Sequence, residues 1–554
     1  RSSTRKVAKA MHRVLITEHI HEEGLRDLYE APNIETIVRL GMSKEELYEA
    51  VKGADALITR SGTAVDAKLL DAGKNLKVVA RVGVGVDNID LEAASKRGVI
   101  VLNSPTGNTL AATELTMGMI IAVARKIPQA NNSLRKGEWR RENFLGTQLY
   151  GKTLLIIGLG RIGSSVATRA KALGMEVFCY DPYINAKKAE NLGVRRLDDL
   201  HGALALADFV TIHVPLTGET KNMIDDEALR SIKKGAYLIN CARGGIVDER
   251  ACAEALKEGR LAGAAFDVHA VEPPKGSPLF DPEIAAKVVL TPHIGANTKE
   301  AQQAVAEIVV KNLIKALNGE PYENAVNIPY MENRMTLQER EFLSLARRMG
   351  MIAACVVKEH IANMTVTMAG PLFEEFELNL PFELPYRYMP FTTAALKGLL
   401  EVRLGPEVNA MSAPLLAKEQ GVSIFESRTE ARTYKNILSV EIKSQNKAFS
   451  MDGTVTEEGK KRIVRVDGYE IDFVPEGWIL LFSNHDRPGV IGKIGTLLGD
   501  YNVNIANFAL GRKNGSGLAI AALQLDSSAP REIMEKIQKD ADLLWAHLIN
   551  LNGE

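Results

Sequence analysis

Residues 153–163 read TLLIIGLGRIG, a strand-like apolar run that meets a glycine-rich turn. The run before the first glycine is typical of a buried strand, and helical periodicity begins after the last glycine. In a strand–turn–helix unit, the first glycine of this pattern permits the tight turn, the second lets a phosphate approach the backbone, and the third lets the helix pack on the strand. The glycine motif consists of Gly158, Gly160, Arg161, Ile162 and Gly163, with Leu159 inside it. It predicts a βα unit that holds a dinucleotide pyrophosphate at a helix N-terminus.

An acidic residue follows at the spacing that such a unit requires. Asp181 ends the next predicted strand, 18 residues beyond Gly163. A carboxylate there accepts hydrogen bonds from an adenosine ribose 2′-OH and repels a 2′-phosphate, so NAD is favoured over NADP. The alternative is a structural βα turn with a solvated aspartate.

The N-terminal half of the chain alternates strand-like and helical segments. Apolar runs at 14–17, 54–59, 76–82 and 98–103 alternate with helical stretches such as 43–52, and further runs recur up to residue 291. This alternation predicts parallel βα units in an α/β fold. Because the glycine motif lies in mid-chain, we expect a Rossmann-type NAD-binding domain (109–298) inserted into a flavodoxin-like substrate domain (12–108 and 299–330). The cleft between the two domains is expected to bind substrate.

Length and composition set the broad class. The chain has 554 residues, so several hydrophobic cores are expected. Its 46% hydrophobic and 25% charged residues are typical of globular proteins, and no apolar run approaches the roughly 18 residues of a membrane span. With 68 basic and 69 acidic side chains, the formal charge of -1 gives no basic excess for nucleic acid. We therefore expect neither a membrane nor a nucleic-acid partner.

Cysteine usage and the N-terminal segment bear on the compartment. The four cysteines, Cys179, Cys241, Cys252 and Cys355, have no CxxC or metal-ligand spacing. Their scarcity predicts a reducing compartment, no disulfide scaffold and no metal site. Residues 1–13 contain five Lys or Arg side chains and no acid, which fits either a frayed terminus or the remnant of a transit peptide. We expect a cytoplasmic protein, with a plastid or another organelle as the alternative.

The C-terminal part predicts two further domains. Residues 331–476 indicate an α+β domain without recognisable chemistry. Its expected features are a helix over 337–360, a Pro- and aromatic-rich stretch over 373–391, and short strands near 437–442 and 463–466. Residues 477–554 predict the order βαββαβ, with Asn514-Gly515 as a hairpin turn, which is a ferredoxin-like unit.

Three polar side chains follow successive predicted strands of the nucleotide-binding fold. Arg243 follows the run AYLIN, Glu272 follows AAFDV and His293 follows VVLT. Ligands of open α/β sheets bind at the carboxyl ends of strands. Oxidation of a hydroxy acid needs a cation for the carboxylate, a base for the hydroxyl proton and a group that tunes the base. A carboxylate beside an imidazole fixes its tautomer and favours its protonated form, so Glu272 and His293 are a candidate acid/base pair.

Each of the three also has an ordinary structural explanation when taken alone. Arg243 fits a surface ion pair, Glu272 a solvated loop acid and His293 a satisfied strand-end histidine. His213 and His269 follow strands as well, and we interpret them as structural because no carboxylate lies in phase with them.

Together the motifs resemble one family. The glycine motif, residues 213–217 (HVPLT), 240–249, 267–273 and 291–295 closely resemble the D-isomer-specific 2-hydroxyacid dehydrogenases, over about residues 12–330. The resemblance implies that Arg243, Glu272 and His293 are catalytic, and a Glu rather than a Gln at 272 separates the chain from the formate dehydrogenase branch. Besides the glycine motif and Asp181, the implied NAD-binding residues are His213, Pro215, Thr220, Cys241, Ala242, Asp267 and Gly295. Among these, Asp267 is expected to meet the nicotinamide amide.

The C-terminal extension narrows the expected substrate. An intervening regulatory and assembly domain followed by an ACT-like unit is similar to the long form of the branch that oxidises D-3-phosphoglycerate to 3-phosphohydroxypyruvate with NAD, the first step of L-serine biosynthesis. The implied substrate-binding residues are Arg60, Ser61, Val84, Gly85, Asn108 and Arg141. Amides at Val84 and Gly85 suit a carboxylate, whereas Arg60 and the pair Arg140-Arg141 suit a phosphate. The alternative for that pair is a solvated helix end.

The ACT-like unit suggests control by an amino acid. Asn484, Asp486 and Asn504 resemble groups that bind an amino acid between paired subunits, which implies an L-serine effector and a homodimer or homotetramer. Loop capping is the alternative role for these side chains. Two other functions stay open. One is another D-2-hydroxyacid dehydrogenase, acting on glyoxylate/hydroxypyruvate or D-lactate. The other is an NAD-sensing binding protein like the corepressors that share this fold.

Overall fold

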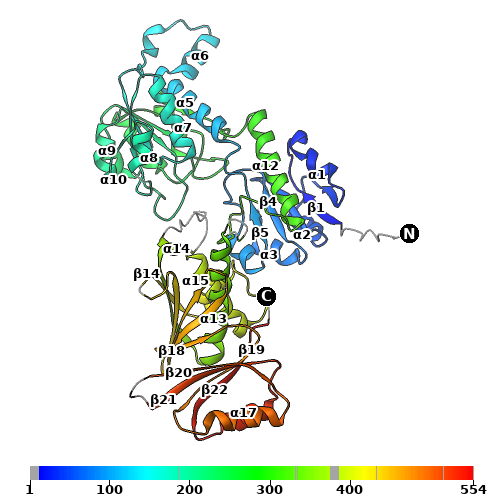
Figure 1. Ribbon diagram of the computed structural model, residues 1–554. Helices are drawn as coiled ribbons and strands as arrows, with labels where there is room; N and C mark the ends of the chain where they lie inside the picture. Colours follow the sequence, from blue (N-terminus) through cyan, green and yellow to red (C-terminus); the bar gives the residue numbers. More distant parts are fainter. Residues whose placement is uncertain are drawn as a thin grey trace.

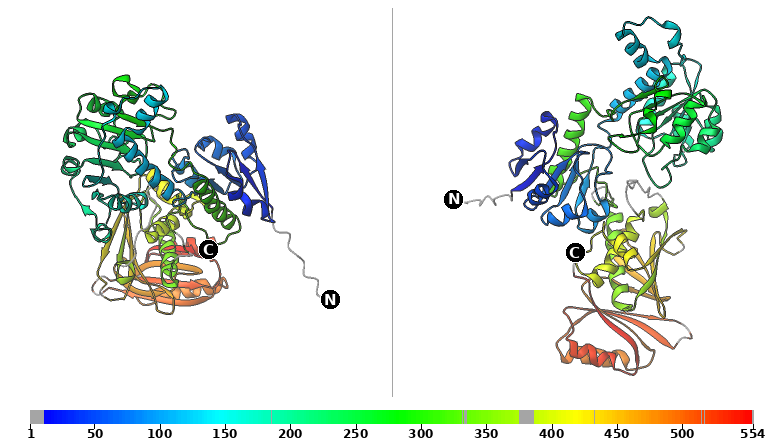
Figure 2. Two further views of the ribbon diagram at one scale, coloured as in Figure 1. Left: turned by 90° about the horizontal axis from the view of Figure 1, so that it is seen from above. Right: turned by 180° about the vertical axis from the view of Figure 1, so that it is seen from behind.

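Four β-sheets follow one another along the chain in the computed structural model (Figure 1). The structure describes residues 11–184, 186–330, 332, 335–374, 386–431, 433–513, 515 and 517–552. Most of the basic N-terminal segment, the predicted turn residue Asn514 and the centre of the Pro- and aromatic-rich stretch lie outside the described residues. The first two sheets form the N-terminal half, and the last two lie against each other at the C-terminal end (Figure 2).

The first sheet is parallel, with the order β2-β1-β3-β4-β5. Its strands are β1 (His12–Ile16), β2 (Ile34–Val38), β3 (Ala56–Thr59), β4 (Val78–Arg81) and β5 (Ile100–Leu102). Its helices are η1 (Glu22–Leu25), α1 (Arg26–Glu30), α2 (Lys44–Val51), α3 (Ala67–Ala72), α4 (Leu91–Lys96) and the distant α12 (Lys299–Leu317). In α12, Val305 and Val309 share a buried cluster with Val14 and Ile58, so the chain returns to this sheet after completing the second. The strand order confirms the predicted flavodoxin-like fold.

The second sheet is also parallel, with the order β12-β11-β10-β9-β6-β7-β8. Its strands are β6 (Thr153–Ile157), β7 (Glu176–Tyr180), β8 (Arg195–Arg196), β9 (Phe209–Ile212), β10 (Ala236–Asn240), β11 (Leu261–Phe266) and β12 (Val288–Leu290). Its helices are α5 (Thr109–Arg125), α6 (Ile127–Arg135), η2 (Arg141–Phe144), α7 (Arg161–Ala172), α8 (Ala186–Asn191), α9 (Leu200–Leu206), α10 (Asp226–Ser231), α11 (Glu249–Lys257), η3 (Pro278–Phe280) and η4 (Pro282–Ile284). The predicted Rossmann-type fold is confirmed, and the strand order reverses between β6 and β9, where open α/β sheets bind ligands.

The third sheet is mixed, with the order β14-β13-β15-β16-β17-β18. Its strands are β13 (Ile361–Ala369), β14 (Ser423–Thr429), β15 (Ile437–Ser444), β16 (Ala448–Val455), β17 (Lys461–Val466) and β18 (Tyr469–Phe473). Its helices are α13 (Leu337–Val356), α14 (Pro371–Glu374), α15 (Pro390–Leu404) and α16 (Ala413–Glu419). The interior Gly350 lies where α13 crosses α15, because a Cβ there would overlap the carbonyl oxygen of Ala395. The α+β character of this region is as predicted.

The predicted helix over 337–360 is too long. α13 ends at Val356, and Val357 already has extended backbone with φ -104° and ψ 103°. His360 directly precedes β13, which pairs with β14 on one side and β15 on the other. Pairing of β13 inside the sheet stabilises the extended conformation and ends the helix early.

The fourth sheet is antiparallel, with the order β20-β21-β19-β22. Its elements are β19 (Trp478–His485), α17 (Val490–Asp500), β20 (Ile505–Arg512), β21 (Leu518–Leu525), α18 (Arg531–Gln538) and β22 (Leu543–Asn550), which is the predicted βαββαβ order. One face, including Leu480 and Phe482, packs on α17 and α18. The other face, including Ile479 and Leu481, joins the hydrophobic core of the third sheet. Both faces are therefore buried at the central strands β19 and β21, whereas the edge strand β20 is largely exposed.

No helix in the part of the chain that the structure describes combines the length and hydropathy needed to cross a bilayer.

Candidate active site

A cleft of about 700 Å³ lies between the first and second sheets. The first sheet contributes the loops after β3 and β4, and the second contributes the loops after β10, β11 and β12. The predicted residues that line it are Arg60, Ser61, Val84, Gly85, Asn108, Arg243, Glu272 and His293. Side chains from two sheets therefore meet at one site, as the sequence predicts.

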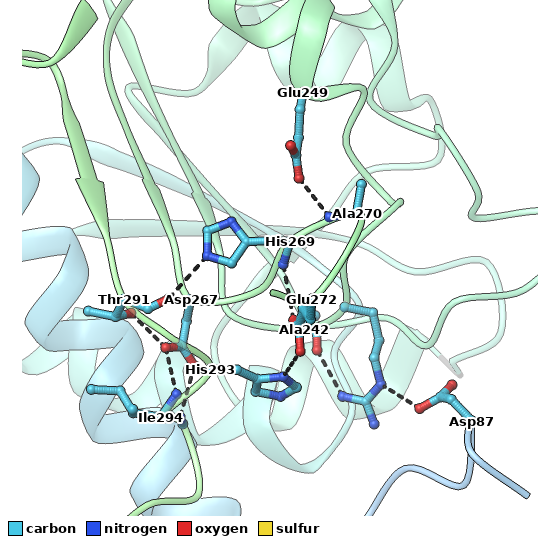
Figure 3. Close-up of polar contacts among 12 residues, drawn as sticks. Asp87, Ala242, Glu249, Asp267, His269, Ala270, Glu272, Thr291, His293 and Ile294 are labelled. Atoms are coloured by element: carbon cyan, nitrogen blue, oxygen red, sulfur yellow. Dashed lines mark hydrogen bonds and ion pairs between the residues drawn. The ribbon is translucent and has the colours of Figure 1, made fainter. Parts of the chain in front are cut away.

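His293 and Glu272 are in direct contact. Nδ1 of His293 lies 2.7 Å from Oε2 of Glu272 (Figure 3). The other carboxylate oxygen of Glu272 accepts a hydrogen bond from the backbone N–H of His269 at 3.1 Å. With Nδ1 facing the carboxylate, Nε2 is the nitrogen left for a substrate proton.

The turn that carries His293 is held by Asp267. His293 has φ of 51°, a left-handed conformation that is rare for a residue with a side chain. The fully buried carboxylate of Asp267 accepts hydrogen bonds from the backbone N–H groups of Ile294 and Gly295, both at 2.8 Å, and from Thr291 Oγ1 at 2.6 Å. These contacts offset the backbone strain and aim the imidazole. The expected contact between Asp267 and the nicotinamide stays a prediction, and the structure gives this residue a second, positioning role.

Arg243 reaches across the cleft to the first sheet. Its Nη1 donates to the Ala242 carbonyl at 2.8 Å, and its Nε lies 3.4 Å from Asp87 Oδ2 (Figure 3). A Cβ on Gly85 would overlap this guanidinium, and a Cβ on Gly244 would overlap the His269 carbonyl oxygen. These two glycines let the loop that bears Arg243 lie against the loop that bears Glu272 and against the amides of Val84 and Gly85.

The loop that bears Arg60 is ordered by Glu18. The Glu18 carboxylate accepts hydrogen bonds from the backbone N–H groups of Arg60, Gly62 and Thr63 and from Thr59 Oγ1. Desolvation opposes ionisation, but these donors outweigh it and lower the pKa of Glu18. The loop is thus preorganised at the cleft mouth.

Arg81 is a cleft residue that the sequence did not suggest. It ends β4 and lines the cleft. Burial lowers the pKa of Arg81 to about 10, and the neighbouring positive charge of Arg243 contributes to the same shift. Its Nε is buried without a hydrogen-bond partner among the described residues. The sequence feature that could have identified Arg81 is the presence of one arginine inside the apolar run of residues 76–82.

Arg141 does not join the cleft of its own chain. It begins η2, which follows α6 in the chain, and is absent from the cleft lining. Arg141 therefore lies outside the cleft that holds His293 in its own chain, and its contact with substrate stays a prediction.

The glycine motif has the geometry that a dinucleotide needs. Gly158 has φ of 92°, and a Cβ there would lie 2.7 Å from the His213 carbonyl oxygen. A Cβ on Gly163 would overlap the Gly158 carbonyl, whereas one on Gly160 would meet nothing within 4 Å. Gly160 caps α7 without a side-chain hydrogen bond, so a phosphate can approach open backbone at the helix N-terminus. The residues present fit NAD.

The remaining cofactor predictions fall around this motif. Asp181 accepts hydrogen bonds from the N–H groups of Leu159 and Tyr183 at 2.9 and 3.0 Å, and so lies beside the motif. Arg161 donates to the Pro105 carbonyl at 3.4 Å, and Ile162 packs on the core under α7. These positions agree with an adenosine site at the end of β7.

The loops after β9 and β10 hold the other predicted contacts. Desolvation lowers the pKa of His213 to about 3, so this imidazole is neutral, and its Nε2 lies 3.0 Å from Thr211 Oγ1. Thr220 Oγ1 donates to the Pro215 carbonyl at 2.6 Å, which ties that loop. Burial raises the pKa of Cys241 to about 12, so its thiol is not a nucleophile. Their contacts with NAD stay predictions.

Replacing Asp181 with alanine should relax the choice of cofactor. Without the carboxylate, a 2′-phosphate meets less repulsion, so the ratio of kcat/KM for NADP to that for NAD should rise at least about tenfold. Steady-state kinetics with both cofactors measure the ratio. Asp226→Ala, which removes an aspartate paired with Arg230 on α10, is the matched control. An unchanged ratio in the Asp181 variant would remove this residue from cofactor selection.

The three predicted effector residues are not together in one chain. The Asn484 amide is buried, and Oδ1 has no hydrogen-bond partner among the described residues. Asp486 pairs with Arg512 at 3.2 Å, whereas Asn504 donates to Asp526 at 2.6 Å. The register places Asn484 beside Ala519 and residue 505 beside Leu525, at opposite ends of β21.

Comparisons with known proteins agree with this geometry. Residues 117–295 match the D-isomer specific 2-hydroxyacid dehydrogenase NAD binding domain, 338–467 the D-3-phosphoglycerate dehydrogenase intervening domain, and 478–542 the ACT domain. The fold and the cleft thus define the class of NAD-dependent D-isomer-specific 2-hydroxyacid dehydrogenases. The D-3-phosphoglycerate dehydrogenase of Methanocaldococcus jannaschii is 42% identical over 541 residues, which cover 98% of this chain and 100% of that protein. The chain belongs to the D-3-phosphoglycerate dehydrogenase family.

Other relatives give the same result. The D-3-phosphoglycerate dehydrogenase of Bacillus subtilis (strain 168) is 38% identical over 545 residues, covering 98% of this chain and 100% of that protein. The solved TT0316 protein of Thermus thermophilus is 39% identical, with a TM-score of 0.53 over 57% of this chain and 99% of that chain. The apo-structure of D-lactate dehydrogenase from Escherichia coli is 26% identical, with a TM-score of 0.52 over the same shares. These two structures cover 57% of the chain each, so they bear on the dehydrogenase fold alone.

Proposed function

We propose that the chain oxidises D-3-phosphoglycerate to 3-phosphohydroxypyruvate with NAD as hydride acceptor. The observation that carries the proposal is the set of three arginines, Arg60, Arg81 and Arg243, that line the same cleft as His293. One guanidinium is enough for the carboxylate of any 2-hydroxy acid, so the additional positive charge fits a second anion, the phosphate. Relatives that match this chain over their full length are named D-3-phosphoglycerate dehydrogenase, which supports the same substrate.

In this reaction His293 removes the hydroxyl proton. Its Nε2 accepts the proton while Nδ1 keeps its contact with Glu272, which stabilises the imidazolium that forms. Arg243 orients the substrate carboxylate and the developing carbonyl oxygen. NAD, when bound at the glycine motif, supplies the acceptor for the hydride. The amides of Val84 and Gly85 provide further donors on the opposite wall of the cleft.

A substrate panel tests the proposal. NAD reduction is measured with D-3-phosphoglycerate, D-glycerate and D-lactate, and we expect kcat/KM to favour the phosphorylated acid by about 10²-fold. Arg81→Met should lower that preference roughly 10- to 100-fold by removing a charged hydrogen-bond donor. Arg97→Met is the control, because Arg97 pairs with Asp71 outside the cleft. Equal rates with all three acids would favour another 2-hydroxyacid dehydrogenase, and no turnover at all would favour an NAD-sensing binding protein.

We further propose that two copies of the chain complete the sites that one copy leaves incomplete. Asn504 lies at the other end of the fourth sheet from Asn484 and Asp486, so an L-serine site with all three needs paired ACT domains. Leu134, Trp139 and Leu145 are exposed on the segment that carries Arg141, a surface suited to a second copy. Repeating the NAD reduction assay with L-serine added tests the proposed effector site.

A further inference from the structure

The loop that carries Glu272 is anchored by one side chain, Glu249, which no role yet explains. Glu249 is the first residue of α11, capped by Asp248. Its Oε1 accepts a hydrogen bond from the backbone N–H of Ala270 at 2.6 Å, and its Oε2 accepts one from Ser277 Oγ, also at 2.6 Å (Figure 3 draws the first). One carboxylate thus holds both ends of the segment 270–277.

This segment has little else to fix it. Ala270, Val271, Glu272 and Pro273 are at least partly exposed, and a Cβ on Gly276 would meet nothing within 4 Å. Among the described residues, hydrogen bonds that join 270–277 to the rest of the chain go to Glu249, to His293, to the preceding His269 and, from Ser277, to Leu279 and Phe280 of the following helix η3. Besides the contacts that Glu272 makes itself, the Glu249 carboxylate is what ties Ala270, two residues before Glu272, to another element.

The anchor also lies next to the other contact of Glu272. Ala270, whose N–H binds Glu249, follows His269, whose N–H binds Glu272 at 3.1 Å. The neighbouring amides of His269 and Ala270 thus link the two carboxylates through a single residue, His269. On the other side, the His269 carbonyl lies against Gly244, the neighbour of Arg243. A shift of residues 269–270 would displace Glu272 relative to both His293 and Arg243.

We propose that Glu249 is a positioning residue for the reaction, acting through Glu272 on His293. This proposal rests on the proposed function, since it assigns a role to the same acid/base pair. A misplacement of about 1 Å in a catalytic group can cost roughly 10²-fold in rate. Loss of the anchor should therefore lower kcat while the sites for NAD and the substrate anions remain intact.

A double-mutant cycle separates positioning from a general structural role. Glu249→Ala should lower kcat about 10- to 100-fold in the wild-type chain, with KM for NAD and the melting temperature nearly unchanged. In the Glu272→Gln background the same change should lower kcat by less than about threefold, because the residue it positions is already lost. Equal losses in both backgrounds, or no loss in the wild-type chain, would overturn the proposal.

Conservative and matched variants complete the test. Glu249→Gln keeps an acceptor for Ala270 and should retain kcat within about threefold. Ser277→Ala removes one of the two hydrogen bonds to Glu249, and its kcat should lie between those of Glu249→Gln and Glu249→Ala. Glu254→Ala is the control, since Glu254 lies on the same helix and pairs with Lys257 at 3.3 Å. If Glu249→Ala does not fold, the kcat values of Glu249→Gln and Ser277→Ala are compared instead. Equal kcat in these two variants would contradict the positioning role of Glu249.

A readout independent of turnover keeps this proposal distinct from the proposed function. Amide hydrogen exchange of the segment around Ala270 should quicken in Glu249→Ala and stay unchanged in Glu254→Ala. A wild-type chain that turns over none of the 2-hydroxy acids would contradict the proposed function, while faster exchange would still support the anchor. Unchanged exchange together with unchanged kcat would contradict the anchor alone.

Discussion

His293→Ala is expected to lower kcat for D-3-phosphoglycerate oxidation by about 10³-fold, because a general base contributes roughly 10² to 10⁴ to the rate. The imidazole lies in the cleft, away from the glycine motif, so the affinity for NADH should change less than about threefold. Stopped-flow turnover and NADH fluorescence titration measure the two quantities.

His201→Ala is the matched control for this variant. His201 also belongs to the second sheet's part of the chain, but its Nδ1 lies 2.9 Å from Ser231 Oγ on the surface. It should keep full activity. A kcat within about tenfold of wild type in His293→Ala would show that another group removes the proton.

Arg243→Lys is expected to lower kcat/KM by about 10² to 10³-fold. Lysine keeps the positive charge but loses the planar fork that holds a carboxylate and a carbonyl oxygen together. It also loses the geometry of the Nη1 contact with Ala242 and the Nε contact with Asp87. Both kcat and KM should change, because the guanidinium binds the ground state and the developing oxyanion alike.

The control for this substitution is Arg230→Lys, which alters an exposed ion pair with Asp226 on α10. Its kinetics should match the wild type. An Arg243→Lys variant with normal kcat and a raised KM would restrict Arg243 to substrate binding.

Much of the fold and of the acid/base site could be predicted because the signals are local. The glycine motif and the strands before Arg243, Glu272 and His293 each follow from sequence patterns within a short window. The carboxyl ends of parallel strands meet at one edge, so residues far apart in sequence could be placed together.

The rest depends on contacts that no local pattern encodes. Arg81 resembles an ordinary strand end until the second sheet brings Arg243 beside it. The end of α13 is set by the pairing of β13, and the role of Glu249 emerges only when Ala270 and Ser277 fold onto it. Arg141 and Asn504 lie away from their expected partners within one chain, which sequence spacing cannot reveal.

The burial of both faces of β19 limits how the proposed regulation can be dissected. Ile479, Leu481 and Ile549 complete the hydrophobic core around α13, so a chain cut at residue 476 would leave that core open to water. Such a truncated enzyme would tend to aggregate. A change in its activity would then reflect lower stability as well as any loss of regulation. Point substitutions at Asn484 or Asn504 remove no member of either hydrophobic cluster and are the cleaner way to test the proposed effector site.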